Sequence, residues 1–182
     1  KLATFLELVD DLRAGGHRAL VFSQFTSHLA LVQEALDRKG VPSLYLDGRT
    51  PAKERSSLVS RFQEGDEPLF LISLKAGGTG LNLTAADYVV HLDPWWNPAA
   101  EDQASDRAHR IGQTKPVTVV RLLAQGTIEE AVVKLHEEKR GLAEAILAES
   151  SGVAKTSSEE LVDLIRLGTT ESVGDDGPVD DA

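Results

Sequence analysis

Three polar residues recur at helical spacing in the middle of the chain: Gln103, Arg107 and Arg110. Separations of four and three residues place them on one face of a helix predicted near 99–111. The opposite face carries small or apolar residues, namely Ala100, Ala104, Ala108 and Ile111. Two neighbouring guanidiniums repel each other unless an anion lies between them, and their planar groups match phosphate oxygens. The spacing therefore favours a triphosphate site, while the alternative is a solvated face with Arg110 paired to Asp106.

A glycine-rich segment from Lys75 to Asn82 follows a strand-like apolar run. Its three glycines, Gly77, Gly78 and Gly80, let backbone N–H groups approach a phosphate closely, although an ordinary tight turn has the same composition. The segment is not a dinucleotide fingerprint, because the third glycine of that motif is missing. No G-x-x-x-x-G-K-[ST] sequence occurs in the chain either, so the element that grips the β- and γ-phosphates of a nucleotide is absent.

A loop from Asp93 to Pro98 contains both tryptophans of the chain, Trp95 and Trp96. A proline at each end stiffens this loop. Because an indole ring is large and amphipathic, the loop can either stack on a partner or anchor itself in the core.

Basic side chains gather after Asp47 and Gly48, at Arg49, Lys53, Arg55 and Arg61. An ordinary solvated helix face explains the last three of them equally well. The five histidines show no metal-ligand spacing such as H-E-x-x-H, and the chain has no cysteine. We therefore expect no metal ion to be held by this chain alone.

The composition is typical of a globular domain. The chain has 182 residues and a mass of 19.6 kDa, with 41% hydrophobic and 26% charged residues, enough for one domain with its own core. No apolar run reaches the ~20 residues that span a bilayer, and no signal-peptide pattern opens the chain. Methionine is absent even at position 1, which indicates a fragment of a longer protein.

Acidity is concentrated at the carboxyl-terminal end. The net charge is −10, and residues 151–182 hold eight acidic but only two basic side chains. The body, 1–150, has a net charge of −4, which disfavours general nucleic-acid binding and restricts any such site to a local patch. A short helix is predicted at 158–167, and the rest of the acidic tail is predicted to be disordered.

Helical and strand-like segments alternate along the body. The pattern predicts helices near 2–12, 26–40, 51–62, 99–111 and 128–148, and strands near 18–23, 43–47, 69–74, 88–92 and 117–123. A capping box from Thr127 to Glu130 opens the last helix. This alternation favours an α/β fold in which helices cover both faces of a parallel sheet. Ligands of such sheets bind at the loops after the strand carboxyl ends, where the unusual residues lie.

Five segments, in this order, resemble the second motor lobe of the Swi/Snf-type ATPases of helicase superfamily two. They are VFSQFT at 21–26, LDGR at 46–49, SLKAGGTGLNL at 73–83, DPWWNP at 93–98 and DQASDRAHRIGQ at 102–113. The resemblance extends from about Phe5 to Ala148. It implies a RecA-like three-layer sandwich with a mostly parallel central sheet, a helicase C-terminal domain over 1–150, and a brace helix at 128–148.

The resemblance also implies roles for individual residues. Arg107 and Arg110 would be arginine fingers that stabilise the γ-phosphate of ATP bound on a separate first lobe. Gln103, Gly80 and Asn82 would lie at the nucleotide.

Double-stranded DNA is the second partner that the resemblance implies. The residues matching DNA-facing positions are Ser23, Gln24, Gly48, Arg49, Lys75, Gly77 and Gly78, and those linking DNA to the ATP cleft are Trp95 and Trp96. The first RecA-like lobe of the same polypeptide would hold most of the ATP with its Mg²⁺. The expected protein is an intracellular, monomeric DNA translocase without membrane contact, and the isolated chain is expected to be inactive.

Two other functions stay open at this stage. A freestanding nucleotide- or sugar-phosphate-binding enzyme would bind a nucleotide without a second lobe. A non-catalytic interaction module would dock through the acidic tail or the segment 161–165. The excess of arginine over lysine, 11 to 8, favours a bacterial source.

Overall fold

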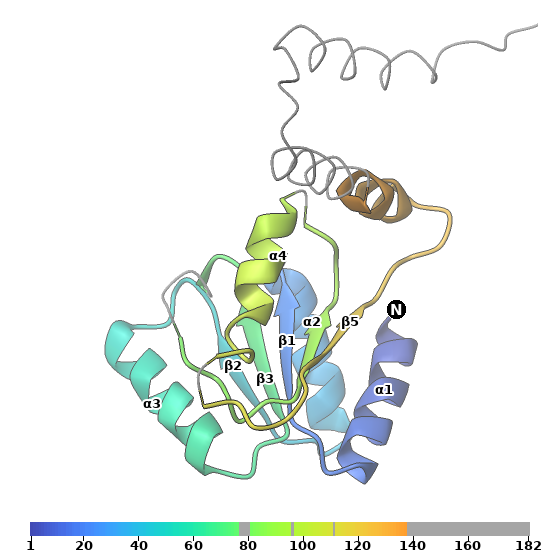
Figure 1. Cartoon of the computed structure of the whole chain (residues 1–182). Coiled ribbons are helices and arrows are strands. Elements are labelled where there is room, and N and C mark those ends of the chain that lie inside the picture. Colours follow the sequence, from blue (N-terminus) through green and yellow to red (C-terminus); the bar gives the residue numbers. More distant parts are fainter. Residues whose placement is uncertain (77–80, 96, 111, 138–182) are drawn as a thin grey trace, which may run out of the picture. The chain divides into compact units, whose positions relative to one another are not determined.

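A single parallel sheet organises the fold in a computed structural model, which describes residues 1–76, 81–95, 97–110 and 112–137. Within these residues, five strands lie in the order β2-β3-β1-β4-β5. They are β1 (Ala19–Ser23), β2 (Ser43–Leu46), β3 (Leu69–Ser73), β4 (Tyr88–His91) and β5 (Thr118–Arg121). All four strand pairings are parallel, so the carboxyl ends lie at the same edge of the sheet (Figure 1).

Helices cover both faces of this sheet (Figure 1). On one face pack α1 (Leu2–Ala14) and α2 (Thr26–Arg38), and on the other pack α3 (Ala52–Glu64) and α4 (Pro98–Ser105). The three-layer α/β prediction is confirmed. Each of the five predicted strands is present, with its ends shifted by two residues at most.

Two apolar cores lie on opposite faces of the sheet. Successive side chains of a strand point to opposite faces, so Val21 packs with α1 and α2 whereas Phe22 packs with α3 and α4. Phe5 of α1 fills the first core and Phe62 of α3 fills the second, and neither is more than 1% exposed. The inner strands β1 and β3 are buried along their whole length and are almost continuous apolar runs, because helices cover both faces of the sheet there.

The helix before the two arginines is shorter than the sequence predicts. α4 ends at Ser105, six residues before the predicted end, and the backbone continues as turns. The carbonyl of Arg107 accepts a hydrogen bond from the N–H of Leu83 (3.0 Å), so it is committed to a neighbouring loop instead of the helical ladder. Arg107 and Arg110 therefore do not share a helical face with Gln103, which corrects the predicted arrangement.

The last described helix begins at residue 128, as the capping pattern predicts. Its hydrogen bonds are shifted by one residue from an ideal capping box. Thr127 Oγ1 accepts from the N–H of Glu129 (3.3 Å), and the Glu130 carboxylate accepts from the N–H of Gly126 (3.1 Å).

Residues 1–137 form one compact unit. The predicted helix end at 148, the domain boundary at 150, and the tail with its helix at 158–167 lie outside the described residues. In the described part of the chain, no helix is long and apolar enough to cross a bilayer.

Candidate nucleotide and DNA site

Most of the predicted site residues that the structure describes lie where a strand reaches its carboxyl end. They are Ser23 at the end of β1 and Gln24 directly after it, Gly48 and Arg49 after β2, Lys75 after β3 and Trp95 after β4. Open parallel sheets bind their ligands at this edge. The topology therefore gathers residues that are far apart in sequence.

Arg107 is a buried cation, and two of its three guanidinium nitrogens lack an acceptor among the described residues. The residue is 2% exposed, and within the described part of the chain nothing accepts a hydrogen bond from its buried Nε and Nη1 atoms. Burial, and secondly the positive charge of Arg110, lower the pKa of Arg107. A guanidinium nevertheless stays protonated in proteins, and a buried cation is costly unless it is paired. The geometry therefore suits an anion supplied from outside these residues.

The turn that carries Arg107 is hydrogen-bonded to the residue that follows the glycine-rich segment. The bond from Leu83 N–H to the Arg107 carbonyl brings Arg107 beside the chain that follows Asn82. Asn82 is exposed, as are Gln103 and Arg110. Two motifs separated by more than twenty residues are thus joined at one place.

Asp93 connects the loop after β4 to the end of β1. Its buried carboxylate accepts hydrogen bonds from the Ser23 hydroxyl and from the N–H of Gln24 (2.9 Å), and it lies 3.4 Å from His28 Nδ1. Burial alone raises the pKa of Asp93, but the hydrogen bonds from His28, Ser23 and Gln24 outweigh burial and leave the pKa below its ordinary value. The carboxylate is therefore charged at neutral pH and holds the two loops together.

Ser23 is buried, which differs from the DNA-facing side chain that the resemblance implies. The residue is 0% exposed, its hydroxyl donates to Asp93, and its oxygen accepts from the N–H of Phe25 (3.0 Å). Gln24 is half-buried, and its Nε2 donates to the carbonyl of Pro94 (3.3 Å). Both side chains brace the loop at this edge.

Glu101 fixes the tryptophan loop to α4 and β5. This residue is 1% exposed; its Oε1 accepts from the N–H of Trp95 (2.7 Å), and its Oε2 accepts from Nε of Arg121 (2.8 Å). Because both carboxylate oxygens are satisfied, the buried charge is compensated by a cation and a backbone donor. The backbone of the half-buried Trp95 is therefore held by a carboxylate that is itself fixed in an ion pair with Arg121.

His91 lies beneath the same helix in its neutral form. Its Nε2 is 3.1 Å from Ser105 Oγ, and the Ser105 hydroxyl donates to the Glu101 carbonyl (3.0 Å), so Nε2 is assigned the ring proton. Burial lowers the pKa of His91 to about 4, an effect that Glu101 opposes and Arg121 reinforces. This ring is thus a fixed, uncharged link between β4 and α4.

The predicted basic cluster divides into two groups. Arg49 and Lys53 are exposed, as is Lys75, and their side chains form no ion pair with any residue that the structure describes. Arg55 is hydrogen-bonded to the turn after β2, and Arg61 is paired with a glutamate at the other end of α3. The first group is available to phosphate and the second is not.

Four residues with roles implied by the resemblance lie outside the described ranges: Gly77, Gly78, Gly80 and Trp96. Within the described ranges there is no cluster of three or more metal-ligating side chains. None of the residues that the structure describes is therefore assigned to a Mg²⁺ ion.

Sequence reasoning missed the buried polar network of His91, Asp93, Glu101 and Arg121. A signal was available for Glu101, which precedes the buried Ala104 by three residues and therefore falls on the apolar face of the predicted helix. A charged side chain on such a face is costly unless it has a partner, and the partner, on β5, is not identifiable from spacing.

Comparisons with known proteins identify the family of this chain. The family model described as "Helicase conserved C-terminal domain" matches residues 1–112. The chromatin-remodeling ATPase INO80 of Cryptococcus neoformans is 42% identical over 165 residues, which is 90% of this chain and 9% of that protein. The DNA repair protein RAD5 of the same species is 42% identical over 183 residues, 98% of this chain and 15% of that protein.

A solved structure shares the fold. The C-terminal part of the Fun30 ATPase domain superposes with a TM-score of 0.71 at 36% identity, covering 73% of this chain and 44% of that one. The first curated relatives are far longer, and the chain spans 18% or less of each. The matched motifs, the parallel sheet and the family model agree: this chain belongs to the helicase conserved C-terminal domain family, as the second RecA-like lobe of a Swi/Snf-type ATPase.

Proposed function

We propose that this chain is the second motor lobe of an ATP-dependent translocase on double-stranded DNA. In this proposal ATP binds on a first lobe, and closure of the two lobes brings Arg107 and Arg110 onto the γ-phosphate. The guanidiniums then stabilise the charge that develops on the transferred phosphoryl group. A finger of this kind contributes roughly 10³–10⁵ in rate.

The burial of Arg107 without an acceptor is the observation that carries the proposal. This chain supplies half of an ATP site: it has the cations, but its sequence lacks the phosphate-binding loop. A triphosphate held by another lobe would supply the missing acceptors. Gln103, Asn82 and Gly80 are proposed to border the same nucleotide.

The proposed DNA surface is formed by the loops after β1, β2 and β3. Arg49 and Lys75 supply exposed cations, and Gly48, Gly77 and Gly78 would allow backbone N–H groups to approach phosphates. Such contacts read no bases, so binding is expected to be independent of sequence and weakened by salt. Ser23 and Gln24 are proposed to position the loop after β1 through their hydrogen bonds to Asp93 and Pro94, without contacting DNA through their side chains.

The tryptophan loop is proposed to connect the two sites. It is joined to the DNA side through Asp93 and Ser23, and to α4, which precedes the two arginines, through Glu101. Alternating grip of the two lobes on one strand would move the motor along the duplex. Mg²⁺ would neutralise phosphate charge when bound with ATP on the first lobe, and none of the residues described here is assigned to it.

The test is substitution of each arginine in the full-length protein. Arg107→Ala and Arg110→Ala should each lower the ATP turnover rate by roughly 10³-fold, with duplex binding and the thermal unfolding midpoint retained. Arg13→Ala, which removes an exposed arginine of α1, serves as the matched control. Turnover that survives either finger substitution would refute the proposed role.

Calorimetry separates the proposal from a freestanding enzyme. The chain alone should show no ATP binding in the micromolar range, since the phosphate-binding loop lies on the other lobe. Tight ATP binding by the chain alone would favour the freestanding alternative instead.

A further inference from the structure

The turn between β2 and α3 is supported by a side chain of the helix that follows it. We propose that Arg55 is a positioning residue, which keeps the turn from Asp47 to Thr50 in the shape that places Arg49 against a DNA phosphate. The inference rests on the proposed DNA contact of Gly48 and Arg49. It adds the residue on which the geometry of that contact depends.

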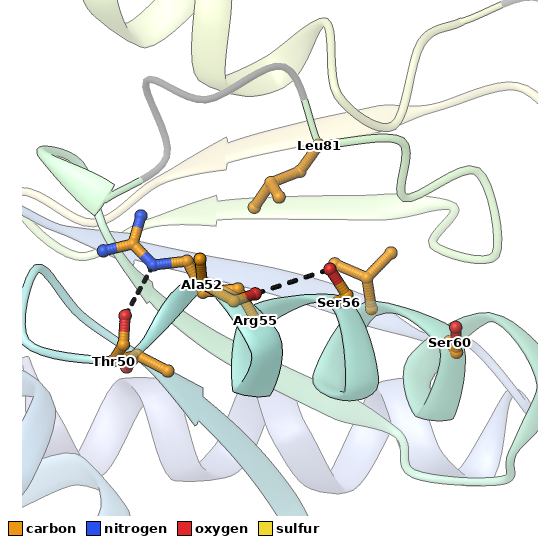
Figure 2. A pocket seen from close by; sticks show the side chains of 7 residues that line it. Thr50, Ala52, Arg55, Ser56, Ser60 and Leu81 are labelled. Carbon is orange, nitrogen blue, oxygen red and sulfur yellow. Dashed lines mark hydrogen bonds between the residues drawn. The ribbon is translucent and has the colours of Figure 1, made fainter.

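Arg55 donates hydrogen bonds to three carbonyl groups of this turn. Its Nε donates to the carbonyl of Thr50 (2.7 Å), the bond drawn in Figure 2. Its Nη2 donates to the carbonyls of Gly48 (3.2 Å) and Asp47 (3.3 Å). A planar guanidinium presents its donors in a fixed fork, so satisfying three acceptors constrains the backbone that carries them.

The other hydrogen bonds of the turn leave its tip in solvent. Asp47 Oδ1 accepts from the N–H of Arg49 (2.8 Å), and the N–H of Asp47 donates to Thr50 Oγ1 (3.1 Å). Gly48 and Arg49 are both exposed. The exposed side chain of Arg49 forms no ion pair with the described residues and is therefore available to an external anion.

Arg55 itself is placed for an internal role. It is half-buried on α3 beside a cavity of about 580 Å³, with Leu81 on the far side of that cavity (Figure 2). Its guanidinium is directed at Thr50 and the turn, whereas Arg49 and Lys53 are exposed without an ion partner among the described residues. We therefore assign the phosphate contact to the exposed residues, and we assign to Arg55 the role of holding the shape of the turn.

Substitution by lysine distinguishes geometry from charge. In the full-length protein, Arg55→Lys keeps the positive charge but replaces the planar fork by an ammonium group that cannot reproduce three fixed bonds. We expect Arg55→Lys and Arg55→Ala to weaken binding of a duplex oligonucleotide as much as Arg49→Ala does, by roughly tenfold. In the Arg49→Ala background, Arg55→Lys should cause a smaller further loss than in the wild type, because the Arg49 contact that both changes remove is already gone.

A matched control lies two turns further along α3. Arg61→Lys makes the same chemical change at a residue paired with Glu67, and it should leave duplex affinity unchanged. Thermal unfolding of each variant verifies that the fold is retained. Wild-type affinity in Arg55→Lys, or losses that add up in the double variant, would overturn the positioning role.

Hydrogen exchange tests the clamp without DNA. In the full-length protein, Arg55→Lys should accelerate exchange of the Arg49 amide, which donates to Asp47 in the intact turn. Unchanged exchange would refute the clamp even if DNA affinity fell. Accelerated exchange combined with wild-type DNA affinity in Arg49→Ala would instead overturn the proposed DNA contact, and with it the functional part of this inference.

Discussion

The arginines of this fold are stabilised in different ways. Arg18 lies over the ring of Phe62, 4.3 Å from its centroid, and Arg121 is paired with the buried Glu101. Arg107 is more deeply buried than most arginines, yet its Nε and Nη1 have no acceptor among the described residues. An arrangement that costs stability and persists is best explained by a ligand outside the lobe.

Replacing Arg107 by methionine should therefore stabilise the lobe while it abolishes the proposed activity. Methionine fills a similar volume without a buried charge, so the free energy of unfolding of this chain should rise by about 1–3 kcal/mol. Denaturant unfolding of the chain measures the change. Arg13→Met, at an exposed position, should stay within about 0.5 kcal/mol of the wild type. A destabilised Arg107→Met would mean that Arg107 supports the fold.

At the residue scale, the sequence indicates which side chains could bind phosphate better than it indicates which distant residues contact each other. The pairing of Arg107 with Arg110 is visible from spacing, and the structure places Arg110 close enough to lower the pKa of Arg107. The burial of Ser23 beneath Asp93 is not visible, because the two residues are seventy positions apart and meet only when β1 and β4 pair. Long-range pairs of this kind depend on sheet topology.

Elements were predicted well where burial is periodic and less well where a tertiary bond ends a helix. α1 and α2 bury the apolar stripes that the spacing indicates, among them Phe5, Val9, Leu29 and Val32. α4 ends early, where the N–H of Arg107 bonds to the Ala104 carbonyl (3.3 Å) and the Arg107 carbonyl accepts from Leu83 instead of continuing the helix. Helix propensity contributes a fraction of a kcal/mol per residue, so one such tertiary bond is enough to move a boundary.

The link between β4 and α4 predicts a pH dependence of stability. The pKa of His91 is lowered from its ordinary value of 6.5 to about 4 in the folded chain. The unfolded chain therefore binds this proton first as the pH falls. The His91 contribution is complete above pH 6.5 and is lost progressively towards pH 4, by up to about 3 kcal/mol.

Denaturant unfolding of the chain between pH 7 and pH 4 measures this loss. His91→Gln removes the titrating ring, so its stability should change less steeply with pH over that interval. Acidic groups with lowered pKa values, such as Asp87 and Asp93, begin to lose their contribution only near pH 4, and they are present in both proteins, so they do not account for a difference between the two curves. Parallel curves for the two proteins would show that His91 does not titrate as inferred.

At the scale of the whole described unit, alternation of helices and strands was sufficient to predict the layered architecture. Short apolar strands between amphipathic helices leave a parallel sheet as the arrangement that buries both faces. The strand order was not predicted, because β1 lies in the middle of the sheet and pairs with β3 and β4. That order is what brings the loops of the candidate site to one edge.

Charge at this scale is distributed unevenly. The full chain has a net charge of −10, so non-specific attraction to DNA is not expected from the molecule as a whole. The exposed basic residues near the carboxyl edge without an ion pair among the described residues are Arg49, Lys53 and Lys75. Duplex binding by the chain should therefore depend on about three phosphate contacts.

The salt dependence of that binding follows from the number of contacts. Each neutralised phosphate of a duplex adds about −0.9 to the slope of log K against log salt concentration, so three contacts predict a slope of about −3. Fluorescence anisotropy of a labelled duplex, titrated with the chain from low to moderate salt, measures the slope. Two duplexes of unrelated sequence should give the same value, since contacts to phosphate carry no base readout.

Single substitutions show which residues make the phosphate contacts that set the slope. Arg49→Gln, Lys53→Gln and Lys75→Gln should each reduce its magnitude by about 1, and Arg13→Gln on α1 should not change it. A slope of about −6 would require cations elsewhere on the chain and would move the DNA surface away from this edge. A slope of about −3 that none of the three substitutions reduces would do the same, because the contacts would then belong to other residues.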